Sequence, residues 1–496
     1  MHAIDNEERT ALMLASIHGC DAVVRHLLHA GAAVNFTNPN GRTPLMMAAM
    51  HGHEIAVKWL LDADAQVNRS DRTDTTALML ASANGHDRVV QRLLAAGANV
   101  DLCDSNGYTA LFLASRQGHS PIVQRLRNAG AVLSLNPMTP EEGKTALMLA
   151  AANGRAQVVV ELLQRSADMS CIDIEGRTAL MLASANGHVH VVQHLESNSG
   201  PLGLMDNKGQ TALMLASVNG HVDVVQRLLD RSADPNLIDL DGKTALMIAS
   251  AKGYENVVQR LVDRSATLDL VDPEGKSALI LAIQNGHDAV ARILLTRRAN
   301  INLTDEDGKT ALMFAAGNGH DAIVQHLLRA LADMNATDND GKTALLMAST
   351  NGHEIAVKLL INAHADVNLS DLHGKTPLMM AAMHGHEIAV KWLLNARADV
   401  DVSDRNDTTA LMLASASGHD RVVQRLLAAG ANVHLCDSNG HTALLLASRQ
   451  EHSAIVQRLQ NAGAAMDPDP TATTDTKPAV NWPNAIMNYD KQQLVF

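Results

Sequence analysis

Residues 76–108 read TALMLASANGHDRVVQRLLAAGANVDLCDSNGY, and near copies of this segment recur along most of the 496-residue chain. When the first residue of each copy is numbered 0, Leu stands at +2 and +17 and Ala at +5 in every copy, and Gly stands at +9 in all but one, where Glu451 replaces it. The spacing is 33 residues everywhere except for the 36 residues between Thr109 and Thr145. This register predicts an array of small stacked units, not the roughly three globular domains that the length would suggest. The fourteen copies begin at Thr10, Thr43, Thr76, Thr109, Thr145, Thr178, Thr211, Thr244, Ser277, Thr310, Thr343, Thr376, Thr409 and Thr442.

Each copy predicts two short helices and a turn. The residue at 0 is a suitable N-cap for a helix that the Gly at +9 ends, and apolar pairs at +13/+14 and +17/+18 form the stripe of a second, antiparallel helix. An Asp-x-x-Gly turn then projects as a hairpin-like loop before the next copy. Because a single 33-residue unit cannot bury its own apolar face, the units must stack. We expect an all-α repeat solenoid of helix-turn-helix units with projecting β-turn loops, arranged as a curved array.

The composition excludes several classes of function. Hydrophobic residues make up 46% and charged residues 19% of the chain, which favours a folded protein. Aromatic residues are only 2% and the net charge is -13, which disfavour a platform for single-stranded nucleic acid and binding to a phosphate backbone. The longest apolar runs are too short to cross a bilayer, and the first ten residues lack the apolar core of a signal peptide. We expect a soluble cytoplasmic protein in a reducing compartment, with a nuclear location or secretion into a host cell left open.

The sequence gives no support for enzyme chemistry. No Gly-rich phosphate loop appears, and Cys20, Cys103, Cys171 and Cys436 lie in different units without a recurring His or Asn partner. Eleven units carry His at +10, but these residues are a whole repeat apart, so we interpret them as structural caps of the second helix and not as metal ligands. We therefore expect no catalytic residue, no metal and no cofactor.

One unit carries the pattern D-x-x-G-x-T-P-L-x-x-A-A-x-x-G-H most fully, from Asp371 through Thr376 to His386. This pattern resembles that of the ankyrin repeat family, and the resemblance covers about residues 5 to 466. It implies a fold of stacked helix pairs that binds proteins through its loop tips and the concave face of the first helices, without chemistry.

The chain departs from the family pattern at two positions. The family's His at +3 is replaced by Met in ten units, which predicts a soft apolar layer in place of a hydrogen-bonding one. The Gly after the second helix is kept in only five units, and if that position needs a positive φ, each replacement is strained by roughly 1 kcal/mol or more. The replacements in the middle units are Ser166, Ser199, Ser232, Ser265, Arg298, Leu331 and His364.

We divide the chain into an array over residues 1–466 and a tail over 467–496. The junctions near 127–144 and 196–206 are irregular, because Arg127 and Glu196 replace apolar residues at +18. Tolerated loop variation and a hinge are both compatible with these junctions. The tail begins as a Pro-rich linker and then carries the aromatic residues Trp482, Tyr489 and Phe496, which we predict either to cap the last unit or to dock onto another protein.

The predicted partner surface lies over the central units, where a basic residue precedes each N-cap and polar residues follow the first helix. We predict a monomeric, non-enzymatic scaffold that binds other proteins there, as an adaptor or as an effector that a bacterium delivers into a host cell. The alternative is a subunit that recruits substrates to an enzyme such as a ubiquitin ligase and docks through its tail. The predicted contact residues are Lys243, Lys276, Lys309, Lys342, Lys375, Asn219, Lys252, Asn285, Asn318 and Asn351.

Overall fold

A computed structural model of the chain describes residues 4–5, 7–131, 143–164, 167–198 and 200–465. The inserted segment of the first irregular junction, the predicted strained residues Ser166 and Ser199, and the whole tail lie outside these residues. The chain divides into two compact units, Met1–Leu303 and Thr304–Phe496, and each is described by itself.

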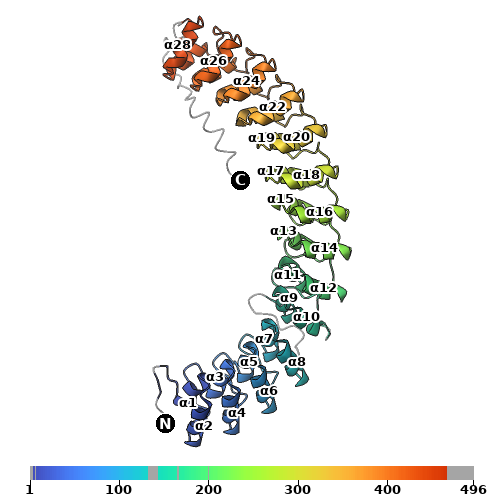
Figure 1. Ribbon diagram of the computed structural model, residues 1–496, viewed down its shortest axis with the longest axis vertical. Helices are drawn as coiled ribbons and strands as arrows, with labels where there is room; N and C mark the ends of the chain where they lie inside the picture. Colours follow the sequence, from blue (N-terminus) through green and yellow to red (C-terminus); the bar gives the residue numbers. More distant parts are fainter. Residues whose placement is uncertain (1–3, 6, 132–142, 165–166, 199, 466–496) are drawn as a thin grey trace. The chain divides into compact units, whose positions relative to one another are not determined.

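The described residues form 28 short α-helices, two for each of the fourteen repeats (Figure 1). This confirms the predicted all-α repeat solenoid. In the first unit the helices are α1 (Ala11–Ile17), α2 (Asp21–His29), α3 (Pro44–His51), α4 (Glu54–Asp62), α5 (Ala77–Ala83), α6 (Asp87–Ala95), α7 (Ala110–Gln117), α8 (Ser120–Asn128), α9 (Ala146–Ala152), α10 (Ala156–Leu163), α11 (Ala179–Ala185), α12 (Val189–Ser197), α13 (Ala212–Val218), α14 (Val222–Asp230), α15 (Ala245–Lys252), α16 (Glu255–Asp263), α17 (Ala278–Gln284) and α18 (Asp288–Thr296). In the second unit they are α19 (Ala311–Gly317), α20 (Asp321–Arg329), α21 (Ala344–Asn351), α22 (Glu354–Asn362), α23 (Pro377–Met383), α24 (Glu387–Asn395), α25 (Ala410–Ala416), α26 (Asp420–Ala428), α27 (Ala443–Arg449) and α28 (Ser453–Asn461).

The core of each unit is built from the residues that recur in the sequence. The two helices of a repeat pack on each other, first helices pack on the first helices of neighbouring repeats, and second helices pack on second helices. The Leu at +2 and the Ala at +5 are buried in every repeat and the Leu at +17 in all but the first, where Leu27 is half-buried; Leu78, Ala81 and Leu93 illustrate the pattern. The stripe predicted from apolar spacing is therefore the surface on which successive repeats stack.

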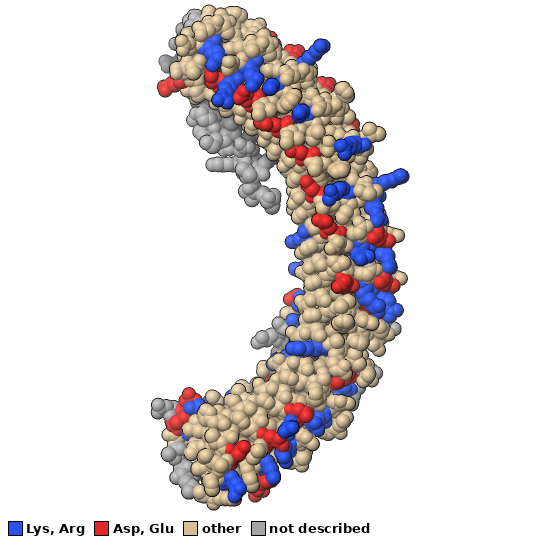
Figure 2. Space-filling view, viewed as in Figure 1, with Lys and Arg blue, Asp and Glu red and all other residues tan. Residues whose placement is uncertain are grey.

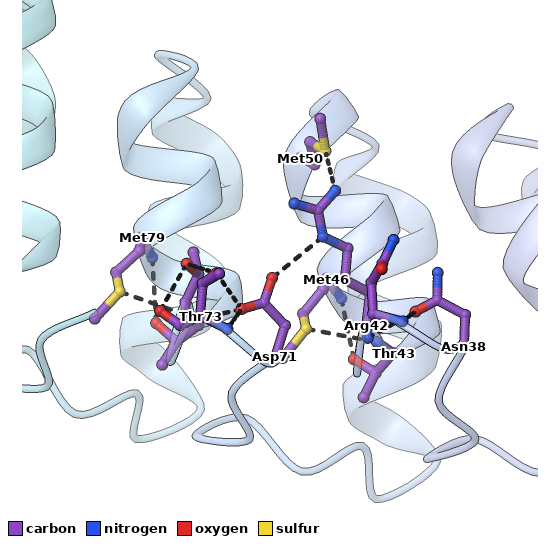
Figure 3. Close-up of polar contacts among 11 residues, drawn as sticks. Asn38, Arg42, Thr43, Met46, Met50, Asp71, Thr73 and Met79 are labelled. Atoms are coloured by element: carbon purple, nitrogen blue, oxygen red, sulfur yellow. Dashed lines mark hydrogen bonds and ion pairs between the residues drawn. The ribbon is translucent and has the colours of Figure 1, made fainter. Parts of the chain in front are cut away.

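The first helix of each repeat begins where the sequence predicts, because the Thr or Ser at 0 accepts a hydrogen bond from the backbone N–H at +3. In the second repeat, Thr43 Oγ1 accepts from Met46 N at 3.2 Å, and Met46 Sδ accepts in return from Thr43 N at 3.5 Å (Figure 3). Eight repeats carry this reciprocal pair. The Met residues at +3 are buried, as the predicted soft apolar layer requires, but the layer also bonds, since the weakly accepting thioether occupies the place of the acceptor in a capping box.

The backbone confirms the predicted strain after the second helices. At that position φ is 64° at Ser232 and Ser265, 65° at Arg298 and Leu331, and 66° at His364. Two residues outside the predicted set, Asp64 and Arg397, share the conformation with φ of 60° and 64°. Each non-Gly residue in this left-handed region costs about 1–2 kcal/mol, because its Cβ approaches the following carbonyl oxygen.

Both irregular junctions contain buried charges that are paired across the repeat boundary. Arg127 Nη1 lies 4.0 Å from Glu161 Oε2 of the fifth repeat, and burial raises the pKa of Glu161. At the second junction, Glu196 Oε2 accepts from Arg227 Nε at 2.9 Å and from Arg231 Nε at 3.3 Å. Burial raises the pKa of Glu196 although both arginines oppose that shift. The sequence indicated lost apolar contacts here, but it did not reveal these partners, which stand at +16 of the next repeat (Glu161 and Arg227) and at +20 (Arg231).

Candidate partner-binding surface

The loops before the first helices are held in shape by their buried Asp residues. From here on, each loop is counted with the repeat whose first helix it precedes. In the loop of the eighth repeat, Asp239 Oδ1 accepts from the backbone N–H of Asp241 at 3.0 Å and of Lys243 at 2.8 Å. Several loops also close as an isolated antiparallel bridge between positions -6 and 0, as between Ser70 and Thr76. These contacts confirm the predicted hairpin-like loop and explain why Asp recurs at its first position.

Neighbouring loops within a unit are joined by backbone hydrogen bonds. The N–H at -4 of one repeat donates to the carbonyl at -3 of the preceding repeat, as Leu240 N does to Lys208 O at 3.0 Å and Asn207 N to Glu175 O at 2.9 Å. The second unit has the same bonds, for example from Leu372 N to Asp340 O at 2.8 Å. These bonds hold neighbouring loop tips side by side, except where Pro39 or Pro273 stands at -4 and has no N–H to donate.

The five predicted lysines stand immediately before the N-caps and are half-buried. Lys276, Lys309 and Lys342 are 22–26% exposed, and each ammonium lies 3.0–3.6 Å from a carboxylate two residues earlier. The hydrogen bond from Lys342 holds the pKa of Asp340 below its usual range. Lys and Arg are accordingly interspersed with Asp and Glu on the face seen in Figure 2, so these three lysines carry less free positive charge than the sequence suggested.

The predicted asparagines lie at or next to the C-terminal ends of first helices and are exposed. Their amide nitrogens bond to carbonyls there: Asn219 Nδ2 donates to Leu215 O at 3.0 Å and to Ala185 O of the preceding repeat at 3.1 Å. Asn285 and Asn351 donate to one carbonyl each, at 2.8 Å. Since Asn219 uses both amide hydrogens within the fold, its exposed side presents an acceptor oxygen, which requires a donor from a partner.

The recurring histidines at +10 link consecutive repeats. Ten of them place Nε2 at 2.8–3.3 Å from a carbonyl oxygen at the end of the preceding first helix, as His221 does at Ala185 O. These histidines stand at the N-cap position of the second helix, as predicted, but their side chains make no capping bond there and bridge two repeats instead. Burial lowers the pKa of His419, in line with a neutral ring that donates from Nε2.

The glycine at +9 makes room for this histidine. A Cβ built on Gly187 would lie 2.7 Å from His221 Nδ1, and Gly187 also has a φ of 76°. Glu451, the one exception, belongs to the last repeat in the sequence, where no histidine of a following repeat has to be received. The sequence therefore contains a paired signal, Gly in one repeat and His in the next, that spacing alone did not identify.

The repeated helix pairs and the row of bridged loops agree with the comparison of the chain with family models. The model described as ankyrin repeats (3 copies) matches residues 1–71, 78–173, 132–201, 147–239, 180–272, 246–338, 312–404 and 389–474. The chain belongs to the ankyrin repeat family. No curated protein matches it. Ankyrin repeats indicate a protein–protein interaction scaffold, and they are in general interaction modules that bind other proteins without catalysis.

The remaining described residues offer no arrangement typical of a metal site, a membrane span or a nucleophile. Among the described residues of this ankyrin array, no three His, Cys, Asp or Glu side chains lie close enough to hold a metal ion. Within the same residues, no helix is long and apolar enough to span a bilayer. Burial raises the pKa of the Cys171 thiol, which disfavours the thiolate form that a nucleophile requires. The predicted tail residues Trp482, Tyr489 and Phe496 lie outside the described residues.

Sequence reasoning missed one surface feature of the ankyrin loops. Position -6, at the start of the loop, is apolar and exposed in four consecutive repeats, at Ile172, Met205, Ile238 and Val271. The signal was present in the sequence, because most other repeats carry Ser, Thr or Cys at this position.

Proposed function

We propose that this ankyrin array is a non-enzymatic scaffold whose partner proteins contact the loop row and the adjoining ends of the first helices. The observation that carries the proposal is the exposed amide at the end of successive first helices, fixed by bonds such as those of Asn219 to Leu215 O and Ala185 O. Such groups are pre-organised, so their side chains would lose little entropy when a partner binds. The scaffold acts as an adaptor, or as an effector delivered into a host cell.

The lysines beside the loops contribute to partner binding through their fixed positions more than through their net charge. Lys276 and Lys342 are ion-paired and therefore held in place, while Lys243 and the exposed Lys252 have no carboxylate within 4.0 Å among the described residues. A partner that presents carboxylates can share the paired ammonium groups and neutralise the other two.

Reversal of the charge of selected residues tests whether the partner contacts the loop lysines or the face formed by the second helices. The partner is first captured from native lysate by the full chain, identified by mass spectrometry and purified. The double variant Lys276→Glu/Lys342→Glu is then compared with Arg88→Glu/Arg421→Glu, whose arginines lie on second helices and are 83–84% exposed. Slower association for the lysine variant alone, with unchanged circular dichroism, supports the proposal. Equal rates for both variants would place the contact elsewhere.

The second candidate function is a substrate-recruiting subunit that docks onto an enzyme complex through residues 467–496. It rests on the clustering of Trp482, Tyr489 and Phe496 at the end of a Pro-rich segment. Capture experiments with the full chain and with a chain ending at residue 466 separate the two functions. Loss of an enzyme subunit from the captured set, with retention of other partners, supports the recruiting subunit.

A further inference from the structure

Four consecutive repeats of the first unit share an exposed apolar residue at the same place in the loop. Ile172, Met205, Ile238 and Val271 are 42–53% exposed, and we call them the apolar loop row. Most other repeats carry a polar or small residue at this position, at Thr37, Ser70, Cys103, Thr304, Thr337, Ser370, Ser403 and Cys436, with Ile4 as an apolar exception. The row is therefore a local feature of repeats six to nine and not a requirement of the fold.

Exposed apolar residues at -4 widen this row. Ile174, Leu240 and Pro273 occupy that position in three of the four repeats, and all three are exposed. Exposed apolar residues gathered on neighbouring loops in this way mark a site for a partner, whereas single exposed apolar residues are normal.

The bonding of the loops fixes the spacing of the row. Within a loop the chain pairs with itself across one strand spacing, as in the bridge between Val271 and Ser277. Between the first three loops of the row it pairs across a second one, through the bonds from Asn207 N to Glu175 O at 2.9 Å and from Leu240 N to Lys208 O at 3.0 Å. The fourth loop has Pro273 at the donor position and lacks this bond. Two strand spacings of 4.7–4.9 Å give a period of about 10 Å.

This period selects the conformation of a partner segment. In an α-helix, seven residues advance about 10.5 Å and return to the same face, so one apolar position per heptad meets each loop in turn. In a β-strand, side chains return to one face every two residues, after about 7 Å, which drifts out of register within two repeats. A polyproline II segment returns to one face after about 9.3 Å, but such segments dock in aromatic-lined grooves, and the row contains no aromatic residue. A row of four loops therefore matches about four heptads of a helix.

Two lysines indicate the charge of the partner. Lys208 is exposed beside Leu240, and Lys243 ends the same loop. Neither ammonium has a carboxylate within 4.0 Å among the described residues, in contrast to Arg177 and Lys276 in the flanking repeats, which pair with Glu175 and Glu274. Acidic residues beside the partner's apolar stripe would complement this pair.

We propose that the apolar loop row binds an amphipathic helix with a heptad apolar stripe and acidic flanking residues. The inference rests on the proposed scaffold function and names its partner class for repeats six to nine. A helix of diameter 10–12 Å along about 40 Å of loops covers on the order of 500 Å², which corresponds to a weak, transient contact.

The test uses a 28-residue fluorescent peptide with Leu at two positions of each heptad and Glu at the flanking positions, kept at concentrations where it is monomeric. Its binding to the full chain is measured by anisotropy beside a peptide of the same composition in scrambled order. The variant Ile172→Ser/Met205→Ser/Ile238→Ser/Val271→Ser removes the row, and Ser already occupies this position at Ser70, Ser370 and Ser403. The control Ile55→Ser/Ile355→Ser/Ile388→Ser removes similarly exposed apolar residues from second helices.

We expect the heptad peptide to bind the wild type and the control equally, and the row variant at least tenfold more weakly. Equal binding to the row variant, equal binding of the scrambled peptide, or binding only of a proline-rich extended peptide would each overturn the proposal. The partner proteins purified for the charge-reversal experiment distinguish failure of this inference from failure of the proposed scaffold function. If they bind the row variant normally but lose affinity for the lysine variant, the scaffold function stands and this inference fails.

Discussion

At the scale of single residues, the joint between neighbouring repeats consists of one glycine and the histidine of the following repeat. The glycine supplies a left-handed turn and the space beside its Cα, and the histidine fills that space while it donates to a helix-end carbonyl. A carbonyl at a helix end has no partner within its helix, so each such bond satisfies a group that the fold leaves open. The same joint recurs along both units.

We expect the two residues of this joint to be energetically coupled. His221→Ala removes the bond to Ala185 O and should destabilise the chain by about 1–3 kcal/mol, whereas His190→Ala, on the exposed side of the same kind of helix, should have little effect. Gly187→Ala should also destabilise, but less in the His221→Ala background, because the clash with the ring is then absent. Urea melts of the four chains measure the coupling, and strict additivity would contradict a shared joint.

The left-handed residues after the second helices offer a stabilising change. Leu331 is exposed and has a φ of 65°, so Leu331→Gly should stabilise the second unit by about 1–2 kcal/mol through relief of backbone strain. Gly97→Ala, at the equivalent position with no atom within 4 Å of the new Cβ, should destabilise by a similar amount. Chemical denaturation followed by circular dichroism checks both signs. A destabilised Leu331→Gly would show that the leucine makes a contact that outweighs the strain.

At the scale of helices, the two irregular junctions place charges of opposite sign at the same +18 position, and their surroundings differ. Arg227 and Arg231, the partners of Glu196, are 33% and 46% exposed and can turn toward water. Glu161, the partner of Arg127, is only 12% exposed. Removal of the buried charge therefore leaves a solvated group in one case and an uncompensated carboxylate in the other.

The same apolar substitution should consequently have opposite effects at the two junctions. Glu196→Leu restores the residue common at +18 and should be neutral or stabilise by about 1 kcal/mol or more, because no buried charge remains. Arg127→Leu should destabilise by about 3–5 kcal/mol, since the buried Glu161 loses its counter-charge, and Arg127→Leu/Glu161→Leu should recover much of that loss. Thermal and urea unfolding of the three variants test this order. A stabilising Arg127→Leu would refute the pairing.

The raised pKa of Glu196 predicts a pH effect of definite sign. Because burial places its folded pKa above the unfolded value of about 4.3, the folded state binds the proton more tightly. The stability of the wild type relative to Glu196→Gln should therefore increase as the pH falls from 7 through the folded pKa toward 4.3. Paired urea melts at several pH values measure this difference and cancel the general effect of acid on other carboxylates. A difference that is flat with pH would mean that Glu196 is solvated.

At the scale of the whole chain, stability is shared among nearest neighbours. Helices contact the other helix of their repeat and the equivalent helix of the next one, which is the condition for a chain of coupled units that need not unfold together. We expect hydrogen exchange of the full-length protein to show blocks of amides that open with different free energies, with a boundary at Arg127 or Glu196. One common opening free energy for all core helices would contradict this expectation.

How far the sequence predicts such a structure depends on whether a feature repeats. Leu78, Thr76 and Asp239 stand in register with their equivalents, so the core, the helix starts and the turns could be derived from period and residue type. The charged partners of Arg127 and Glu196 occur only once each, so periodicity could not identify them. Gly187 and the Ala185 carbonyl, which contact the His221 ring, lie in the preceding repeat, so the pattern within one repeat could not identify them either. Likewise, the ion pairs of Lys276 and Lys342 depend on acidic residues that vary between loops.

The common joint has a consequence for how the chain can be rearranged. Nearly every repeat has the same glycine, and most have the same histidine. The contact surface between neighbouring repeats is therefore nearly the same along the chain, and one repeat can take the place of almost any other. The near-identical segments around Trp59 and Trp392 are what such exchange would leave behind. The Arg127–Glu161 and Glu196–Arg227 pairs differ from these common contacts, because each buried charge needs a partner of opposite charge on the next repeat. Repeats shuffled by recombination or by design should therefore be tolerated at the common joints, whereas a new repeat without Glu161, or without Arg227 and Arg231, would leave Arg127 or Glu196 buried without its partner.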